Sequence, residues 1–280
     1  MKEPTARRPV VVGISGDQPE LLTYAAEMAN MLEAPLRVVH AESITMPSGD
    51  PYLGQEMGRL LHEAAQLVLN HARDRLAGHT AGDVEYELRT EPVVFAIETE
   101  SKDAALVVVG ADDVSSVERV AGIDVARRAA LHGHSPVVVV PAGVSHPVVT
   151  EILVALDVHN VVEEALGFAF QIADHTGARL RAVTVLAPTV EAEELAWCKG
   201  RLKGHLAHWH RVFPRVECRA EVILGDPGDE LAREAGEAQM VVVGHPNQPH
   251  RGPFFGKRVA SSLLRAAPSV VAVVPVGRED

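Results

Sequence analysis

The chain has 280 residues and a formal net charge of −12 at neutral pH. Hydrophobic residues make up 47% of it, which excludes an intrinsically disordered chain and suits two domains of ordinary size. The acidic balance argues against a nucleic-acid partner, because no excess of basic residues is present to displace counterions from a phosphate backbone.

The cysteines and the apolar runs indicate the compartment. Cys198 and Cys218 have neither metal-ligand nor redox spacing, so we expect both to be reduced thiols. The N-terminal region has no apolar run long enough for a secretion signal, and no later stretch approaches the length needed to span a membrane. We therefore expect a cytoplasmic protein with no membrane partner.

The first half of the chain alternates apolar runs of strand length with amphipathic segments. Residues 9–15 (PVVVGIS) are almost continuously apolar, as expected for a strand covered on both faces. In residues 21–32 the apolar side chains fall on one helical face. The other expected elements are strands at 36–41, 84–89, 105–110 and 136–141, a loop at 43–53, and helices at 55–76, at 92–99 and from 124 onward.

The second half repeats this order after a linker-like segment at 142–149. Alternating strands and helices require parallel pairing through right-handed crossovers. The sequence therefore predicts two α/β domains, 1–144 and 148–280, each an open five-stranded parallel sheet between two layers of helices. The expected elements of the second domain are strands at 151–157, 179–186, 216–224, 240–244 and 270–275, and helices at 161–176, 190–209, 227–236 and between the last two strands.

A constant offset identifies the two halves as copies of each other. Four residues of the first half recur 134 positions later without a gap: Gly110, Gly122, Val125 and Pro141. Earlier elements match at an offset of 144, as for Leu36 and Leu180. The first copy therefore has about ten extra residues between its second and fourth strands, and we expect them in the loop at 43–53.

Three places in the second half resemble the universal stress protein family. That family opens with a strand ending in Asp, matched by VALD at Asp157, and has a GDP-type turn before its third helix, matched at Gly225. It continues with a VVVG strand, the phosphate motif G-x2-G-x9-G-[S/T]-V, a helix and a closing VVVVP strand. The resemblance covers nearly the whole chain as a tandem pair, and it implies adenine-nucleotide alpha-hydrolase-like domains related by a pseudo-two-fold axis.

The phosphate motif is kept only in part. Laid without gaps from Gly244, it places Asn247 at the second glycine, Lys257 at the third and Arg258 at the hydroxyl residue. Asparagine is a mild change, because it tolerates left-handed backbone better than most residues. Lys257 and Arg258 at a helix start would bring positive charge to phosphate oxygens. The alternative is that both are solvated side chains on an exposed turn.

The resemblance implies that the second copy binds ATP, together with Mg²⁺. In family members that bind ATP, the strand-end Asp and the neighbouring backbone hold the adenosine, and the glycines let the backbone approach the phosphates. Since no general base or Mg²⁺ carboxylate is evident beyond Asp157, any hydrolysis is expected to be slow. The residues expected at the site are Ala155, Leu156, Asp157, Val185, Gly225, Gly244, Asn247, Gly256, Lys257, Arg258 and Val259.

The first copy departs further from the family pattern. Ser15 replaces the strand-end Asp, and Thr90 replaces the glycine of the turn. Asp112, Asp113 and Asp124 would bring negative charge to the place of the phosphates. Ile123 would add bulk there. We expect that this copy has lost ATP binding and serves as a structural partner for the second copy.

Two other functions stay open. One is an interaction module whose pockets are vestigial, and the other is a small-molecule transferase that uses the same crevice. The chain contains no nucleophile elbow of the form G-x-S-x-G, which argues against the enzyme. His205 and His208 have a metal-like spacing but no matching third ligand, so no metal site is expected.

The last strand of each half indicates how the two domains could pair. The valine-rich strands at 137–140 and 270–274 would leave rows of unpaired backbone groups at the sheet edges. In the family that this chain resembles, the last strands pair across a dimer. We expect the two strands to pair within one chain as a pseudo-dimer, and a further homodimer or an unknown protein partner is left open.

Overall fold

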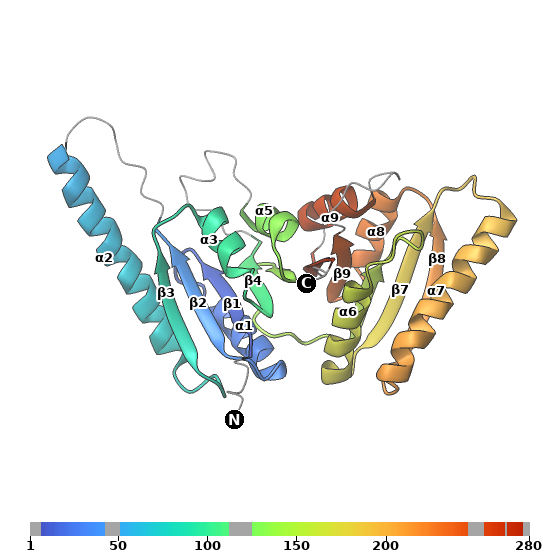
Figure 1. Ribbon diagram of the computed structural model, residues 1–280, viewed down its shortest axis with the longest axis horizontal. Helices are drawn as coiled ribbons and strands as arrows, with labels where there is room; N and C mark the ends of the chain where they lie inside the picture. Colours follow the sequence, from blue (N-terminus) through green and yellow to red (C-terminus); the bar gives the residue numbers. More distant parts are fainter. Residues whose placement is uncertain (1–6, 43–50, 112–124, 246–254, 267, 277–280) are drawn as a thin grey trace, which may run out of the picture. The chain divides into compact units, whose positions relative to one another are not determined.

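The computed structural model describes residues 7–42, 51–111, 125–245, 255–266 and 268–276 (Figure 1). The chain divides into two compact units, Met1–Pro147 (unit 1) and Val148–Asp280 (unit 2). Within the described ranges, no helix combines the length and the apolar composition that crossing a bilayer requires.

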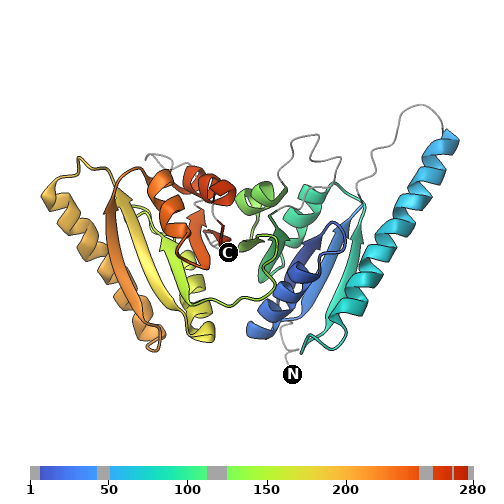
Figure 2. The ribbon, with the colours of Figure 1, turned by 180° about the vertical axis from the view of Figure 1, so that it is seen from behind.

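The described part of unit 1 contains a parallel sheet with the strand order β3-β2-β1-β4-β5. Helices α1 and α2 pack together on one side of it, and α3 and α5 pack together on the other; Figure 2 shows α1 in front of the sheet. The elements are β1 (Val10–Ile14), α1 (Pro19–Met31), β2 (Leu36–Ala41), α2 (Pro51–Leu76), β3 (Val84–Arg89), α3 (Val93–Glu100), β4 (Leu106–Gly110), α5 (Val125–His132) and β5 (Val137–Val140).

Unit 2 repeats this plan with the strand order β10-β9-β6-β7-β8, again all parallel over the described residues. Helices α6 and α7 lie on one side, and α8 and α9 lie on the other (Figure 1). The elements are β6 (Glu151–Ala155), α6 (Glu163–Thr176), β7 (Arg179–Leu186), α7 (Ala192–Val212), β8 (Cys218–Leu224), α8 (Pro227–Ala235), β9 (Met240–His245), α9 (Phe255–Ala266) and β10 (Val270–Pro275).

The predicted fold class, two tandem domains with five-stranded parallel sheets, is confirmed. Four strands consist almost entirely of apolar residues because both faces of each sheet are covered: every residue of β1, β4, β5 and β10 is buried. The pseudo-two-fold pairing of the two units stays a prediction.

The strand registers locate the ten extra residues of the first copy. Leu36 pairs with Val84 in unit 1, 48 positions away, whereas Leu180 pairs with Cys218 in unit 2, 38 positions away. The insertion therefore lies between β2 and β3. Only part of it is in the expected loop, because α2 has 26 residues and α7 has 21.

Helix α2 begins at Pro51, four positions before the predicted start. The prolines of this region predicted a loop. Proline is nevertheless favourable in the first turn of a helix, because amides there have no partner within the helix and the fixed φ angle of proline is helical.

Each unit ties its second strand to its third helix through a buried ion pair. In unit 1 the Glu100 carboxylate, 3% exposed, lies 3.0 Å from Arg37 Nη1. In unit 2 Glu234 pairs with Arg181, and Arg181 Nε also lies 3.1 Å from Glu151 Oε1. Glu100 and Glu234 are 134 positions apart, so this pair is part of the repeat.

The ion pair of unit 2 makes a stability prediction. Removing the Glu234 carboxylate leaves the Arg181 side chain, which is 4% exposed, with less compensation for its buried charge. We expect Glu234→Ala to lower the free energy of unfolding by about 3 kcal/mol in urea titrations. The double variant Arg181→Leu, Glu234→Leu should lose less, because it buries no unpaired charge. Equal stability of Glu234→Ala and the parent would contradict this.

Candidate functional site

The strand order of unit 2 creates a topological switch point at the carboxyl ends of its strands. From β6 the chain proceeds outward to β7 and β8, and then returns to β9, which pairs with β6 on its other side. The carboxyl ends of β6 and β9 therefore flank a topological switch point, where open α/β sheets bind their ligands. Ala155 pairs with Val243, so the turn after β6 and Gly244 lie side by side.

The turn after β6 fixes the orientation of Asp157. Its Oδ1 accepts a hydrogen bond from the His159 amide at 3.0 Å, and its carbonyl oxygen accepts one from the Asn160 amide at 3.0 Å. Asp157 is half-buried. Among the described residues, Asp157 Oδ2 has no hydrogen-bond donor. A ligand hydroxyl or amine at this oxygen would displace no hydrogen bond from the described residues.

The other residues predicted to contact the adenosine are engaged in the packing and hydrogen bonding of the sheet. Leu156 donates its amide to the Val183 carbonyl at 2.9 Å and accepts the Thr184 hydroxyl at 3.0 Å. Val185 is buried within β7, in register with Ile223 of β8. Ala155 is the last residue of β6 and is also buried. These three residues are buried at the ends of their strands, and Asp157 is the one of the four with a polar side chain.

Gly244 has a packing reason as well as a candidate binding role. A Cβ atom at this position would lie 2.5 Å from Val162 Cβ and 2.6 Å from Val162 Cγ2. Val162 is the N-cap residue of α6 and is buried, so α6 begins directly against the end of β9. A glycine is needed there to let helix and strand approach, whether or not a phosphate also approaches.

Gly225 also lies in a tightly packed turn. Its amide donates to the Leu186 carbonyl at 2.9 Å, and a Cβ atom there would lie 2.5 Å from Glu230 Cγ. Asp226 caps α8 by accepting hydrogen bonds from the amides of Gly228 and Asp229, and Pro227 occupies the first helical position. The family-like turn is therefore a well-formed helix start.

The remaining predicted residues belong to the start of α9. Gly256, Lys257 and Arg258 fall in the first turn of this helix, and their side chains lie outside the described part of the structure. Asn247 lies outside the described residues altogether. Val259 is 3% exposed and packs into the core. A helix thus begins within the phosphate-motif segment, and its first turn carries the two basic residues.

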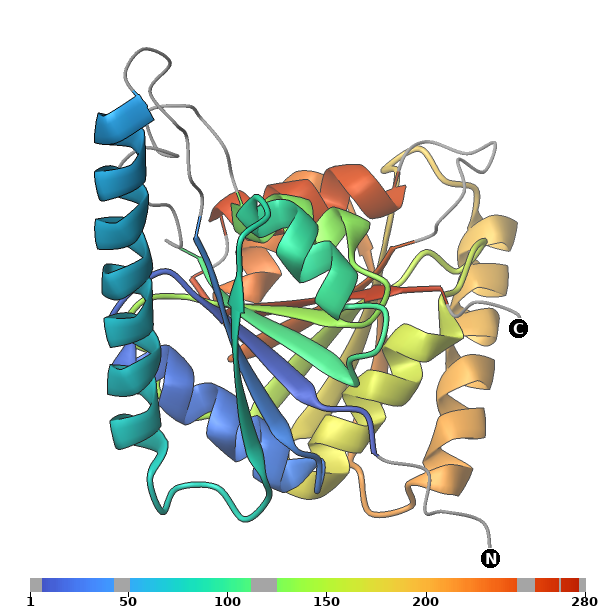
Figure 3. The ribbon, with the colours of Figure 1, turned by 60° about the vertical axis from the view of Figure 1, so that its left-hand side comes forward.

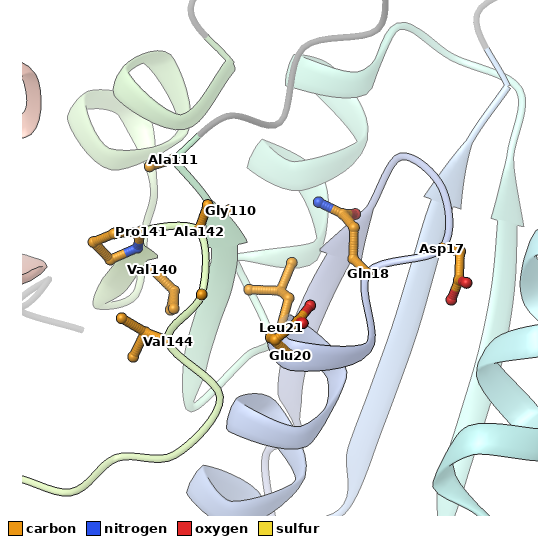
Figure 4. A pocket seen from close by; sticks show the side chains of 11 residues that line it. Asp17, Gln18, Glu20, Leu21, Gly110, Ala111, Val140, Pro141, Ala142 and Val144 are labelled. Atoms are coloured by element: carbon orange, nitrogen blue, oxygen red, sulfur yellow. The ribbon is translucent and has the colours of Figure 1, made fainter.

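A pocket of about 140 Å³ lies at the corresponding edge of unit 1 (Figure 4). Leu21 projects from the start of α1 towards the segment after β5, which turns at Gly143 with a φ of +81°. Asp17 and Glu20 add exposed acids, and no Lys or Arg is among the described residues that line it, so a phosphate would be repelled. The lining residues are Asp17, Gln18, Glu20, Leu21, Gly110, Ala111, Val140, Pro141, Ala142, Gly143 and Val144.

This pocket was not predicted from the sequence. The signal that could have located it is the Pro-Ala-Gly sequence directly after the closing strand, which is typical of a turn folded back over a strand end.

Comparison with known proteins identifies the family. The model of the universal stress protein family matches residues 6–141 and 149–275. The chain belongs to the universal stress protein family. Both units are therefore universal stress protein domains.

Relatives match this chain over nearly the whole length of both proteins. A universal stress protein of Mycolicibacterium smegmatis is 29% identical over 291 residues, with 96% of each chain covered. Universal stress protein Rv2623 of Mycobacterium tuberculosis is 29% identical over 294 residues, covering 97% of this chain and 96% of that protein. The crystal structure of a universal stress protein from Archaeoglobus fulgidus aligns with a TM-score of 0.66 at 16% identity, covering 98% and 99% of the two chains.

The two domains of this universal stress protein close their first turns differently. The strand registers place Ser15 where the second domain has Asp157. The Ser15 amide donates to Gln18 Oε1 at 2.9 Å, so a neutral amide closes this turn in place of a carboxylate. Gln18 is the N-cap residue of α1, as Val162 is of α6. The same position therefore borders the pocket in unit 1 and packs on Gly244 in unit 2.

The cysteine and the histidines of α7 are the other candidate reactive side chains of unit 2. Burial raises the pKa of the Cys198 thiol, and the charges of Glu194 and Asp157 raise it further, so this thiol stays protonated at neutral pH. Within the described ranges no group of three His, Cys, Asp or Glu side chains could hold a metal ion. His205, one of the weak metal candidates, instead contacts Glu163 at 2.6 Å.

The close contact between Gly244 and Val162 predicts that a larger residue at position 244 destabilises the protein. Gly244→Ala should lower the free energy of unfolding by about 1–3 kcal/mol in denaturant titrations, because its Cβ atom overlaps Val162. Val162→Gly should restore part of this loss in the double variant. Gly200→Ala is the control: a Cβ atom there meets nothing within 4 Å, so this change in α7 should be neutral or stabilising. A Gly244→Ala protein as stable as the parent would contradict the account of the packing.

Proposed function

We propose that this universal stress protein binds an adenine nucleotide, ATP with Mg²⁺, in unit 2, and that binding acts on a protein partner. The observation that carries the proposal is the carboxylate of Asp157 in the turn after β6: the His159 amide donates to one of its oxygens, and no described residue donates to the other. It lies at the switch point beside Gly244, where open α/β sheets receive their ligands.

At the adenosine end, Asp157 is the residue proposed to bind the ligand. Its second carboxylate oxygen would accept a hydrogen bond from a ribose hydroxyl. Because the backbone of Leu156 already bonds to Val183 and Thr184, Leu156 and Val185 would contribute apolar contact to the base. Of the residues that the sequence predicted at the adenosine end, only Asp157 would then make a polar side-chain contact with the ligand.

At the phosphate end, the proposal rests on the start of α9. Free amide groups and the helix dipole favour an anion at a helix N-terminus. Gly256, Lys257 and Arg258 occupy this first turn, so backbone amides and two positive charges would meet the phosphates there. When bound, Mg²⁺ would offset phosphate charge. We expect hydrolysis to be slow at most, since the described residues supply no general base in this crevice apart from Asp157.

Unit 1 is proposed to bind no ATP. Its turn lacks the strand-end carboxylate, and exposed acids border its pocket. Coulomb repulsion between like charges at ~4 Å costs ~1 kcal/mol in water and more where water is excluded. Unit 1 would then stabilise unit 2 or contact a partner, and one chain would bind one nucleotide.

One observation favours a second candidate function, an interaction module with vestigial pockets. Gly244 and Gly225 are both explained by packing against Val162 and Glu230, so neither glycine requires a ligand. On this view the family pattern persists because the fold needs it. The two candidates differ in whether Asp157 has a ligand to bind.

Thermal unfolding with and without Mg²⁺-ATP tests the proposal. A ligand at ~100 times its Kd adds ~2.7 kcal/mol of stability, which raises the Tm by several degrees. Asp157→Asn should abolish the rise, because its amide keeps an oxygen for the His159 hydrogen bond but loses the charge. The matched change in unit 1, Asp17→Asn, should leave the rise intact. Identical parent curves with and without ATP, or loss of the effect in Asp17→Asn alone, would overturn the proposal.

A further inference from the structure

Helix α2 exposes an apolar stripe that unit 1 does not cover. Four large side chains on it are unusually accessible: Met57 (49% exposed), Leu60 (48%), Leu61 (37%) and Leu67 (58%). With the exposed Ala64, the positions 57, 60, 64 and 67 alternate in steps of three and four, the spacing of helices that pack along a seam. We call these five residues the α2 stripe.

The α2 stripe is separate from the face with which α2 contacts its own sheet. That face consists of Ala65, Leu69, Ala72 and Leu76, all buried. At 3.6 residues per turn, the centres of the two faces lie about 110° apart around the helix. Figures 1 and 3 show α2 at the outer edge of unit 1 beside β3, with its N-terminal turns reaching past the end of that strand.

The corresponding helix of unit 2 has no such stripe. On α7 the exposed large apolar side chains are Trp197 and Val212, which are 15 positions apart. The stripe therefore coincides with the longer helix of the first domain, and the repeat alone does not account for it. A row of four exposed large apolar side chains on one helix is typical of a protein interface.

We propose that the α2 stripe pairs with the same stripe of a second copy of this chain, with the two helices antiparallel. A two-fold axis near His62 places Met57 opposite Leu67 of the second copy, and Leu60 opposite Ala64 of the second copy. Each large side chain then has a partner, and the small alanine leaves room for leucine at the centre. Leu61 lies near the axis and meets its own counterpart.

The charges beside the stripe favour a second copy over a lipid surface. Arg59 bonds Glu56 at 2.7 Å and Glu63 at 2.5 Å, so this border has one net negative charge among three side chains. Membrane-surface helices instead carry an excess of Lys and Arg beside their apolar face. The charged groups of two copies would repel each other only weakly, because in each copy Arg59 already neutralises one of the two glutamates.

The size of the α2 stripe determines the dimer affinity that we expect. From Met57 to Leu67 it is about 15 Å long, so a pair of helices would bury less than the standard interface of about 1,600 Å². We therefore expect a reversible monomer–dimer equilibrium, with dissociation in the micromolar range.

Sedimentation velocity over a concentration series tests the pairing. The parent should shift from monomer to dimer as its concentration rises. Leu60→Glu should weaken this association at least about tenfold, because it places a charge at the centre of the seam. Its Tm should not change, since Leu60 is about half exposed in the single chain. Val212→Glu, at a side chain of similar exposure (57%) on α7, is the matched control and should dimerise like the parent.

A short bis-maleimide cross-linker tests the geometry. Leu61→Cys should cross-link two chains, whereas Met57→Cys should not, because its two copies would lie about 15 Å apart along an antiparallel pair. The parent, with Cys198 buried and Cys218 half-buried, gives the background. A parent that is monomeric at every concentration would overturn the proposal. So would a Leu60→Glu dimer as strong as the parent, or cross-linking of Met57→Cys in place of Leu61→Cys.

Discussion

Each unit depends on the parallel pairing of its first strand with its fourth, β1 with β4 and β6 with β9. Parallel neighbours need long crossover connections, so this pairing sends the chain to the far edge of the sheet and back. The carboxyl ends of the two paired strands are then left beside each other, facing the turns that follow them. Asp157 and Gly244 follow the last paired residues there in unit 2, as Ser15 and Gly110 do in unit 1.

This arrangement lets the two copies diverge without a change of core. Both units keep buried valine-rich strands and the ion pair between the second strand and the third helix. The differences lie in the turns: Ser15 against Asp157, and Gln18 against Val162. Under the proposed function, the two units share one scaffold and only unit 2 binds the ligand.

Much of the fold could be predicted because runs such as 106–110 and 270–275 are apolar, β-branched and bounded by Gly or Pro. The site could be placed only coarsely. Gly244 fits a phosphate motif, but glycine is also needed where Val162 contacts it, and a sequence pattern does not separate the two reasons. Glu234 looks like a surface residue of a helix until Arg181, on a strand far away in sequence, is found beside it.

The central claim, one nucleotide site located in unit 2, is tested most directly by photo-cross-linking with an azido-ATP analogue followed by peptide mapping. The account predicts that label competed by ATP appears at one equivalent per chain, on peptides from residues 151–275. Competed label on peptides from residues 7–141, or equal label on both halves, would contradict it.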